Sequence, residues 1–322
     1  MWTAISDIVQ PDVLMPYVQE RIADTNAFVK SGVMVEDTRL TNALKSGGTT
    51  GRLPFYKPFD GDDEVLDDTA TGELSLNAAS AAADQYAALA RGKAFSASDL
   101  STVFSGSDPM AAMVNAIGGY WSNAYNGALI KTVQGLTSAA AFSDHLNDIS
   151  GAGTSIFSAD AVIDTRSALG DRAGDSDVIA MHSKALAVAN KADLIDYLRP
   201  SKYELELPYF LGMRVVVDDR LPYTSATDVT EVYIMGAGSV LFGGNAAPVP
   251  FETDRDTLTG GGLDVLVSRS VHAIHPRGAS LDVSGIAGST PSNMELSDGT
   301  VTYTATRDLK NIPIAALKCT TV

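Results

Sequence analysis

The most regular pattern in the sequence is a helical one at residues 108–134. Asp108 is a typical N-cap, and Pro109 stands at the first helical position, where a missing N–H costs nothing. Apolar residues then recur at helical spacing as far as Gln134. The pattern predicts a helix roughly 39 Å long, which is long for a globular domain. Its predicted core face carries Met113, Ile117 and Trp121.

A pair of glycines interrupts this pattern near its middle. Gly118 and Gly119 each cost a helix about 1 kcal/mol relative to alanine. We therefore expect a bend in the helix, or a close crossing by another part of the backbone, at this point.

A second stretch, LPFYKPFDGDDEVLDDT at Leu53–Thr69, cannot form a helix. Leu53, Phe55 and Phe59 fall on one face of an extended strand, and prolines alternate on the other face, so the strand is predicted at a sheet edge or in an isolated hairpin. Six carboxylates follow within the nine residues 60–68. A metal loop, an acid/base active site and a projecting hairpin that meets another subunit are all compatible with this stretch.

The metal interpretation fails the spacing of known sites. A calcium loop that began at Asp60 would need glycine at its sixth position, where this chain has Val65. The pair His272 and His275 lies on a predicted strand, where residues three apart point to opposite faces and cannot share one ion. The sequence therefore predicts no metal site.

No catalytic signature emerges either. The chain lacks a G-x-S-x-G elbow, Cys319 has no neighbouring histidine, and GAGSVL carries Leu241 where a dinucleotide loop needs its third glycine. Asp218 and Asp219 are more typical of a turn than of a catalytic pair. We expect no enzyme and no cofactor. The alternative of a carboxylate-dependent enzyme would use Asp218 with Asp219, or Asp62 with Asp63. The isolated His145 and His182 are predicted to be structural.

The charge balance limits the partners. Thirty-nine acidic against 23 basic residues give a net charge of -16, which repels phosphate backbones, and the sequence shows no basic patch for tight nucleic-acid binding. The single cysteine excludes an internal disulfide and favours folding in the cytosol. We find no signal peptide and no apolar run of the roughly 20 residues that cross a bilayer. A soluble protein made in the cytoplasm is expected.

The remaining segments mix helices and strands without a regular alternation, which predicts the α+β class. Helices are expected at 158–169 and 183–198, and strands in DVIAMHS, GMRVVVDDRLP, TEVYIMGAGSVLFGG, GGGLDVLVSRSVHAIHP and the tail after Val301.

Several phrases, in this order, resemble one family. They are WTAISDIVQPDVL, LPFYKPFDGDDEVLDD, MHS with YFLGMRVVVDD, and ETDRDTLTGGGLDVLVSR followed by HPRG. Together with the order of elements, they resemble the major capsid (coat) proteins of tailed bacteriophages, which have the Hong Kong 97-type fold. The resemblance extends from Trp2 to about Gly278 and is weakest at residues 280–300.

The resemblance implies a subunit of several parts. These are an N-terminal arm (1–45), an extended hairpin loop (46–100), a peripheral domain (101–176) with its spine helix at 108–134, an axial domain (177–261), and a last segment (262–322). The last segment would return strands to the peripheral domain, with the strand at 262–280 and the C-terminal strand grouped together there.

The resemblance also implies the function and the partners. The chain would assemble as pentamers and hexamers into an icosahedral virion shell around double-stranded DNA, with scaffold, decoration and portal proteins as further partners and no contact with a membrane. An encapsulin-type cargo shell is the alternative within the same fold.

The extended loop would then lie over a neighbouring subunit, with its aromatic residues buried against that neighbour and its acids facing bases there. The candidate interface residues are Arg52, Leu53, Phe55, Tyr56 and Phe59 in the strand, the acids Asp62, Asp63 and Glu64, and the candidate basic partners Arg91, Lys93 and Arg255.

Overall fold

The computed structural model describes residues 26–57, 59, 63, 78–99, 109–151, 156–198, 207–244, 247–258 and 261–321. Residues 1–25 of the predicted arm (1–45), the acids Asp62 and Glu64, and the side chain of Met113 lie outside the described residues.

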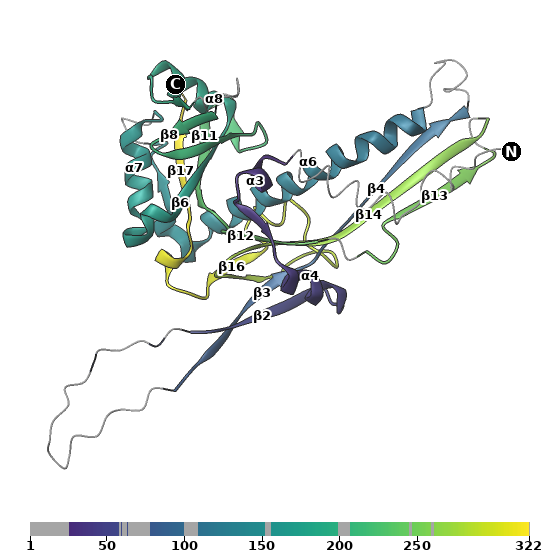
Figure 1. The fold of residues 1–322 in the computed structure, drawn as a ribbon, viewed down its shortest axis with the longest axis horizontal. Coiled ribbons are helices and arrows are strands. Elements are labelled where there is room, and N and C mark those ends of the chain that lie inside the picture. The colour runs from purple at the N-terminus through teal and green to yellow at the C-terminus, as the bar shows by residue number, and fades with distance from the viewer. Residues whose placement is uncertain are drawn as a thin grey trace, which may run out of the picture.

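The molecule is elongated and has three protruding parts (Figure 1). The described helices are α3 (Ala27–Lys30), α4 (Thr38–Lys45), α6 (Pro109–Ser138), α7 (Ala159–Ser167) and α8 (Ser183–Lys191), with 3₁₀ turns η1 (Ala140–His145), η2 (Gly170–Asp175) and η3 (Leu309–Asn311). Helices and strands alternate irregularly, so the predicted α+β class is confirmed.

The largest sheet of the described chain has eight strands. Its order is β5 (Leu146–Asp148), β17 (Ile314–Thr320), β11 (Val229–Gly236), β6 (Ser176–Met181), β9 (Met213–Val217), β8 (Leu207–Phe210) and β7 (Asp196–Leu198), and β10 (Tyr223–Thr224) also pairs with β11.

Both faces of this sheet are buried within the chain. Ile179 and Ile234 point into a cluster with α7 and α8, whereas their neighbours Val178 and Tyr233 point into a second cluster with α6. Successive strand residues alternate between faces, so an unbroken apolar run such as VIAM supplies both cores at once.

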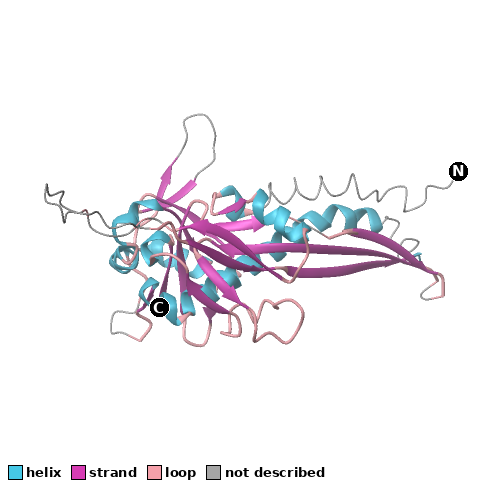
Figure 2. Ribbon diagram, turned by 90° about the horizontal axis from the view of Figure 1, so that it is seen from below, coloured by secondary structure: helices cyan, strands magenta, loops and turns pink. Residues whose placement is uncertain are grey.

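A second sheet forms a long ribbon. Its strands are β1 (Met34–Glu36), β12 (Val240–Gly243), β14 (Leu263–Pro276) and β13 (Phe251–Asp256), and β4 (Leu89–Ser98) pairs with the other edge of β14. Figure 2 shows the ribbon strands extending along α6. Two short hairpins complete the fold: β2 (Thr50–Tyr56) with β3 (Ala81–Ala87), and β15 (Ala279–Asp282) with β16 (Thr302–Ala305).

The C-terminal strand is not where the sequence placed it. We expected it to join the strand at 262–280, but β17 pairs with β11 along the whole of its length, from Thr320 opposite Val229 to Ile314 opposite Met235. It therefore belongs to the eight-stranded sheet with strands of the 177–261 segment. The pairing is decided by the apolar faces that β17 offers on both sides, which suit a central position.

Helix α6 packs on the ribbon through aromatic side chains. Ile117 and Trp121 are buried, and the Trp121 indole Nε1 donates a hydrogen bond of 2.7 Å to Ser268 Oγ of β14. One turn further on, the hydroxyls of Tyr125 and Ser270 are 2.9 Å apart. Alternate residues of β14 thus meet successive turns of the helix, and the helix continues four residues beyond the predicted end, to Ser138.

A close backbone crossing on α6 lies at Gly135, beyond the predicted glycine pair. A Cβ at Gly135 would lie 1.9 Å from the carbonyl oxygen of Leu296, whereas a Cβ at Gly119 would have no neighbour within 4 Å. The helix runs through Gly118 and Gly119 without a break. The loop that follows β15 crosses at Gly135, and Tyr303 donates a hydrogen bond of 2.9 Å to the same Leu296 oxygen.

This crossing predicts opposite effects for two alanine substitutions in one helix. Gly135→Ala should destabilise the subunit by about 1–3 kcal/mol, because the new methyl group collides with backbone that cannot move aside. Gly127→Ala meets no atom within 4 Å and should stabilise the subunit by about 0.5–1 kcal/mol. Urea unfolding of the two purified variants tests this, and equal effects at both positions would contradict the close approach.

Candidate subunit interface

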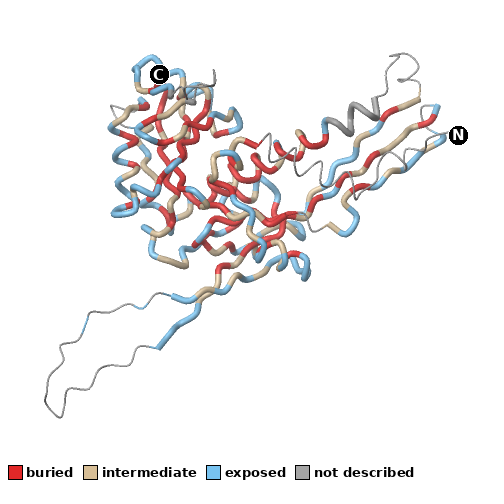
Figure 3. The backbone as a smooth tube through the Cα atoms, in the orientation of Figure 1, coloured by how far each residue is buried: buried red, intermediate tan, exposed pale blue. Residues whose placement is uncertain are grey.

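The β2–β3 hairpin projects from the body and is exposed over much of its surface (Figure 3). In β2, exposed and half-buried residues alternate, with Leu53 and Phe55 on the half-buried side, as the alternating prolines predicted. Tyr56 and Phe59 are exposed to 80% and 73%. Large aromatic side chains left in water are typical of a surface that another protein covers.

Two of the predicted interface residues have partners in their own chain. Leu53 packs against the cluster formed by Leu40, Leu44 and Tyr86, and the guanidinium of Arg307 lies 4.2 Å above the Phe55 ring. Leu53 and Phe55 are therefore partly covered within their own chain. The unburied aromatic surface is that of Tyr56 and Phe59.

A buried carboxylate fastens the hairpin to the body. Asp84 of β3 is buried and accepts a short hydrogen bond from the hydroxyl of Thr306. Nitrogens of His275 and Arg307 each lie 4.0 Å from its other oxygen, close enough for electrostatic attraction although too far for a hydrogen bond. We call these four residues the hairpin anchor.

The anchor changes the acidity of its carboxylate. Burial acts to raise the pKa of Asp84, but the neighbouring His275, the Thr306 hydroxyl and the positive charge of Arg307 outweigh burial and hold the pKa below its usual value. Because the folded pKa is lowered, the charged form stabilises the fold above the unfolded value of about 3.9, and this stabilisation is lost as the pH falls through the folded pKa.

Asp84→Asn is therefore expected to lower the free energy of unfolding by about 1–3 kcal/mol at pH 7, because it removes a buried charge with its partners in place. The difference from the wild type should shrink toward pH 3. Urea unfolding of both proteins at several pH values measures it. Asp148→Asn breaks an exposed ion pair with Lys318 and should cost less than about 1 kcal/mol. A gap between wild type and Asp84→Asn that widened in acid would contradict the anchor.

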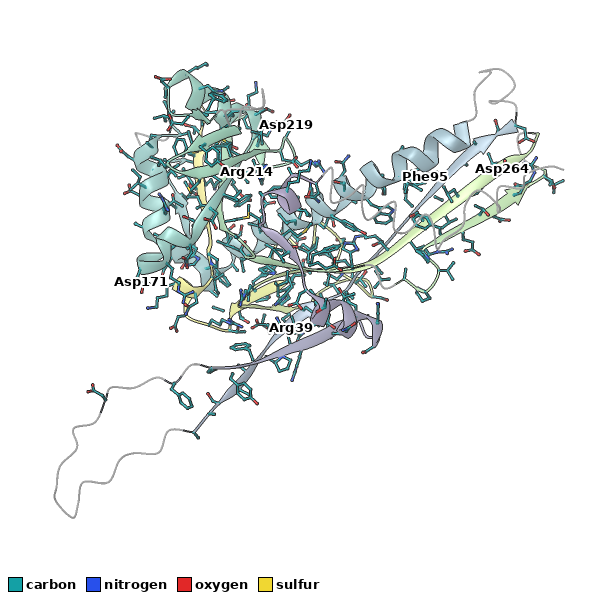
Figure 4. All side chains as sticks on the ribbon, in the orientation of Figure 1. Arg39, Phe95, Asp171, Arg214, Asp219 and Asp264 are labelled. Carbon is teal, nitrogen blue, oxygen red and sulfur yellow. The ribbon has the colours of Figure 1, made fainter. Side chains whose placement is uncertain are left out.

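Two of the three predicted basic partners for the acidic loop are already occupied. Arg255 forms ion pairs with Asp99 at 2.6 Å and Asp264 at 2.7 Å, at the far end of the ribbon, where Asp264 is labelled in Figure 4. Arg91 donates a hydrogen bond of 2.6 Å to the carbonyl oxygen of Pro291, and burial lowers its pKa. Lys93 is exposed on β4, and so is Arg52 on β2. Asp63 is exposed as well.

The stretch that resembles the family least serves an internal purpose. Arg91 binds it at Pro291 and at the Asn293 side chain, and Leu296 and Val301 are buried in the main core. Glu295 orders the loop by accepting hydrogen bonds from the backbone of Ala287 and Ser292. The sequence did not assign this role, because glycine- and serine-rich composition gives no periodic signal.

The histidines have structural surroundings. His272 and His275 are both buried on β14. The ring of His272 packs edge-on against Tyr125 of α6 whereas His275 faces Asp84, so they lie on opposite sides as predicted. Burial, together with the charge of Arg91, lowers the pKa of His272 to about 3. His145 bonds the carbonyl oxygen of Ile314, and His182 caps α8 by accepting from the Lys184 amide.

The candidate catalytic groups are likewise engaged in local structure. Asp218 accepts from the backbone N–H and the guanidinium of Arg220, and Asp219 accepts from the amide of Ser183. The contacts of Asp218 are those of a turn, and the contact of Asp219 joins this turn to the first residue of α8. Burial raises the pKa of the Cys319 thiol to about 12, so the thiolate is disfavoured. Among the described residues, no group of three or more histidine, cysteine or acidic side chains could hold a metal ion.

In the described part of the chain, no helix is both long enough and apolar enough to cross a bilayer.

A long helix on a ribbon of strands, a two-faced α/β body and a projecting hairpin define the Hong Kong 97-type capsid fold. Two solved shells show the same fold. The capsid asymmetric unit of cyanophage Pam1 has a TM-score of 0.58 and 12% identity, covering 94% of this chain and 92% of that one. The capsid of Ralstonia phage GP4 has a TM-score of 0.58 and 10% identity, covering 91% of each.

The sequence itself has a curated relative. The major capsid protein of Bacillus phage SPP1 is 34% identical, in an alignment that covers 98% of this chain and 98% of that one. No protein-family model matches the chain. The chain thus belongs to the family of bacteriophage major capsid proteins, and the resemblance stated from the sequence is confirmed. Its role is structural, that of a coat protein, and not that of the enzyme considered as an alternative.

Proposed function

We propose that the chain assembles with copies of itself, as pentamers and hexamers, into the icosahedral shell of a virion that encloses double-stranded DNA. Scaffold, decoration and portal proteins are proposed as further partners. The observation that carries the assembly is the hairpin with its two exposed aromatic residues, Tyr56 and Phe59, which a single subunit leaves in water. A net charge of -16 repels the phosphate backbone of DNA, which suits a shell that encloses DNA without binding it tightly.

The parts of the subunit are proposed to follow the family, with adjustments where strands pair across the predicted bounds. The hairpin within 46–100 reaches a neighbouring copy, the segment 101–176 with α6 forms the peripheral domain together with β14, and 177–261 forms the axial domain. Because β4, β12 and β13 pair with β14, we assign these three strands to the peripheral domain as well. Because β17 pairs with β11, we assign the C-terminal strand to the eight-stranded sheet rather than to the ribbon. We assign Arg52 and Tyr56 of β2, and Phe59 beyond the end of the strand, to the surface that meets the neighbour.

The proposal predicts particles. The purified chain, expressed alone or with the scaffold protein of its phage, should elute as megadalton shells, and negative-stain images should show closed heads. A protein that stays a small oligomer under both conditions would contradict the proposed assembly.

The exposed aromatic pair is expected to act in assembly and not in folding. Tyr56→Ser with Phe59→Ser should leave a folded subunit that does not close into shells, because each contact loses about 1.5–3 kcal/mol per aromatic residue. Phe55→Ser is the contrasting variant: it removes a half-buried ring that Arg307 covers, so it should destabilise the isolated subunit.

Circular dichroism and light scattering on the purified variants separate the two effects. If the Tyr56 and Phe59 variant lost its fold together with its assembly, the aromatic pair would belong to the subunit's own core and the interface role would be wrong.

A further inference from the structure

A cleft of about 990 Å³ lies between the base of the hairpin and the body of the subunit. The end of β2 forms one wall. The turn η2, the turn between β11 and β12, and the segment around η3 form the others. Four basic side chains line it from four separate parts of the chain: Lys57, Arg172, Arg277 and Arg307.

Most arginines of this subunit are bound by groups of their own chain. Asp37 holds Arg39, Asp218 holds Arg220 and Glu252 holds Arg269, and the same is true of Arg91 and Arg255 described above. Two of the three arginines that line the cleft differ, whereas the third, Arg307, contacts Asp84 and Phe55. Within the described residues, the exposed side chains of Arg172 and Arg277 have no hydrogen bond and no ion pair, and the same holds for the exposed Lys57.

The cleft has a larger share of basic residues than the chain as a whole. Three acids, Asp175, Asp177 and Asp308, line it with the four bases, one of which, Arg307, is already paired with the buried Asp84. The complete sequence has 39 acids against 23 bases. Unpaired bases in a cleft of so acidic a protein favour a partner that presents carboxylates, for which the planar fork of arginine is the best donor.

The same cleft contains the exposed aromatic surface. Tyr56 and Phe59 line it beside Lys57. Tyrosine and arginine together are the residues that most often carry the binding energy of protein interfaces. The exposed aromatics and the unpaired bases are therefore parts of one surface.

We propose that this cleft binds an acid-rich surface of a second copy of the chain. A second copy has the required carboxylate excess, and it is the partner against which a coat subunit packs. The hairpin that carries the proposed interface is also one wall of the cleft, so a neighbour held under the hairpin reaches the bases. The inference rests on the proposed assembly and specifies which bases the neighbour's acids meet: Arg172, Arg277 and Lys57, in place of Arg91 and Arg255.

Zero-length carbodiimide coupling tests this, because it joins a lysine amine only to a carboxylate in direct contact. Particles are assembled from equal amounts of subunit carrying natural nitrogen and subunit carrying ¹⁵N, coupled, digested and analysed by mass spectrometry. We expect peptides in which Lys57 of one isotope is joined to an aspartate or glutamate of the other.

The chain supplies internal controls for this experiment. Lys310 lies 3.6 Å from Asp171 and Lys318 lies 2.9 Å from Asp148 in the same subunit, so both should couple within one isotope only. If these controls couple while Lys57 couples only within its own chain, or not at all, the inference is overturned. Particles would still have formed, so the proposed assembly would stand; absence of particles contradicts the assembly instead.

A charge variant tests the arginines directly. Arg172→Gln with Arg277→Gln should reduce cross-chain coupling at Lys57 about tenfold, a factor that corresponds to about 1.4 kcal/mol. Lys184→Gln with Lys191→Gln removes the same charge from exposed positions on α8 and should leave the coupling unchanged. Equal coupling in both variants would show that the cleft arginines do not hold the neighbour.

Discussion

The pairing of β14 with its neighbours is the interaction on which the rest of the subunit depends. This strand of 14 residues pairs with β4 along ten residues, with β13 at its beginning and with β12 at its end. Two of its serines form hydrogen bonds with aromatic residues of α6, and its His275 is one of the four residues of the hairpin anchor. Ribbon, spine helix and hairpin are therefore all positioned from one strand, and Figure 1 shows them meeting around its lower end.

Local patterns predicted the parts of the fold that are themselves local. The 3.6-residue period and Pro109 gave the helix and its beginning, since both signals depend only on residues within a few turns. The period of two in β2 placed Leu53 and Phe55 on one side for the same reason. The end of the helix was placed four residues short. The last turn of the helix contains Gly135, and the loop that packs against this glycine lies 161 residues further along the chain, at Leu296, so no local pattern reveals it.

The errors share a physical cause, which is that partners distant in sequence leave no local trace. Arg91 and Arg255 are basic residues of the kind that often binds acids at an interface. In this subunit, however, Arg91 donates a hydrogen bond to Pro291 and Arg255 pairs with Asp99. The pairing of β17 with β11 brings together residues about 90 apart, and nothing in either segment distinguishes that neighbour from β14. The order of the sequence motifs shared with the family identified the fold despite these errors, because the motifs are distributed over most of the chain.

The hairpin is attached to the body at one end only, so it can rotate about that end. Its strands are held to the body near Asp84 and Tyr86 and are exposed toward Tyr56. Asp84 lies opposite Leu53, and the three residues from there to Tyr56 extend about 10 Å, so a rotation of about 10° at the anchor moves the end of β2 by about 2 Å. A shell that closes needs subunits in slightly different surroundings. A stiff arm on a small pivot lets one sequence meet those surroundings through rotation at its base, without repacking either core.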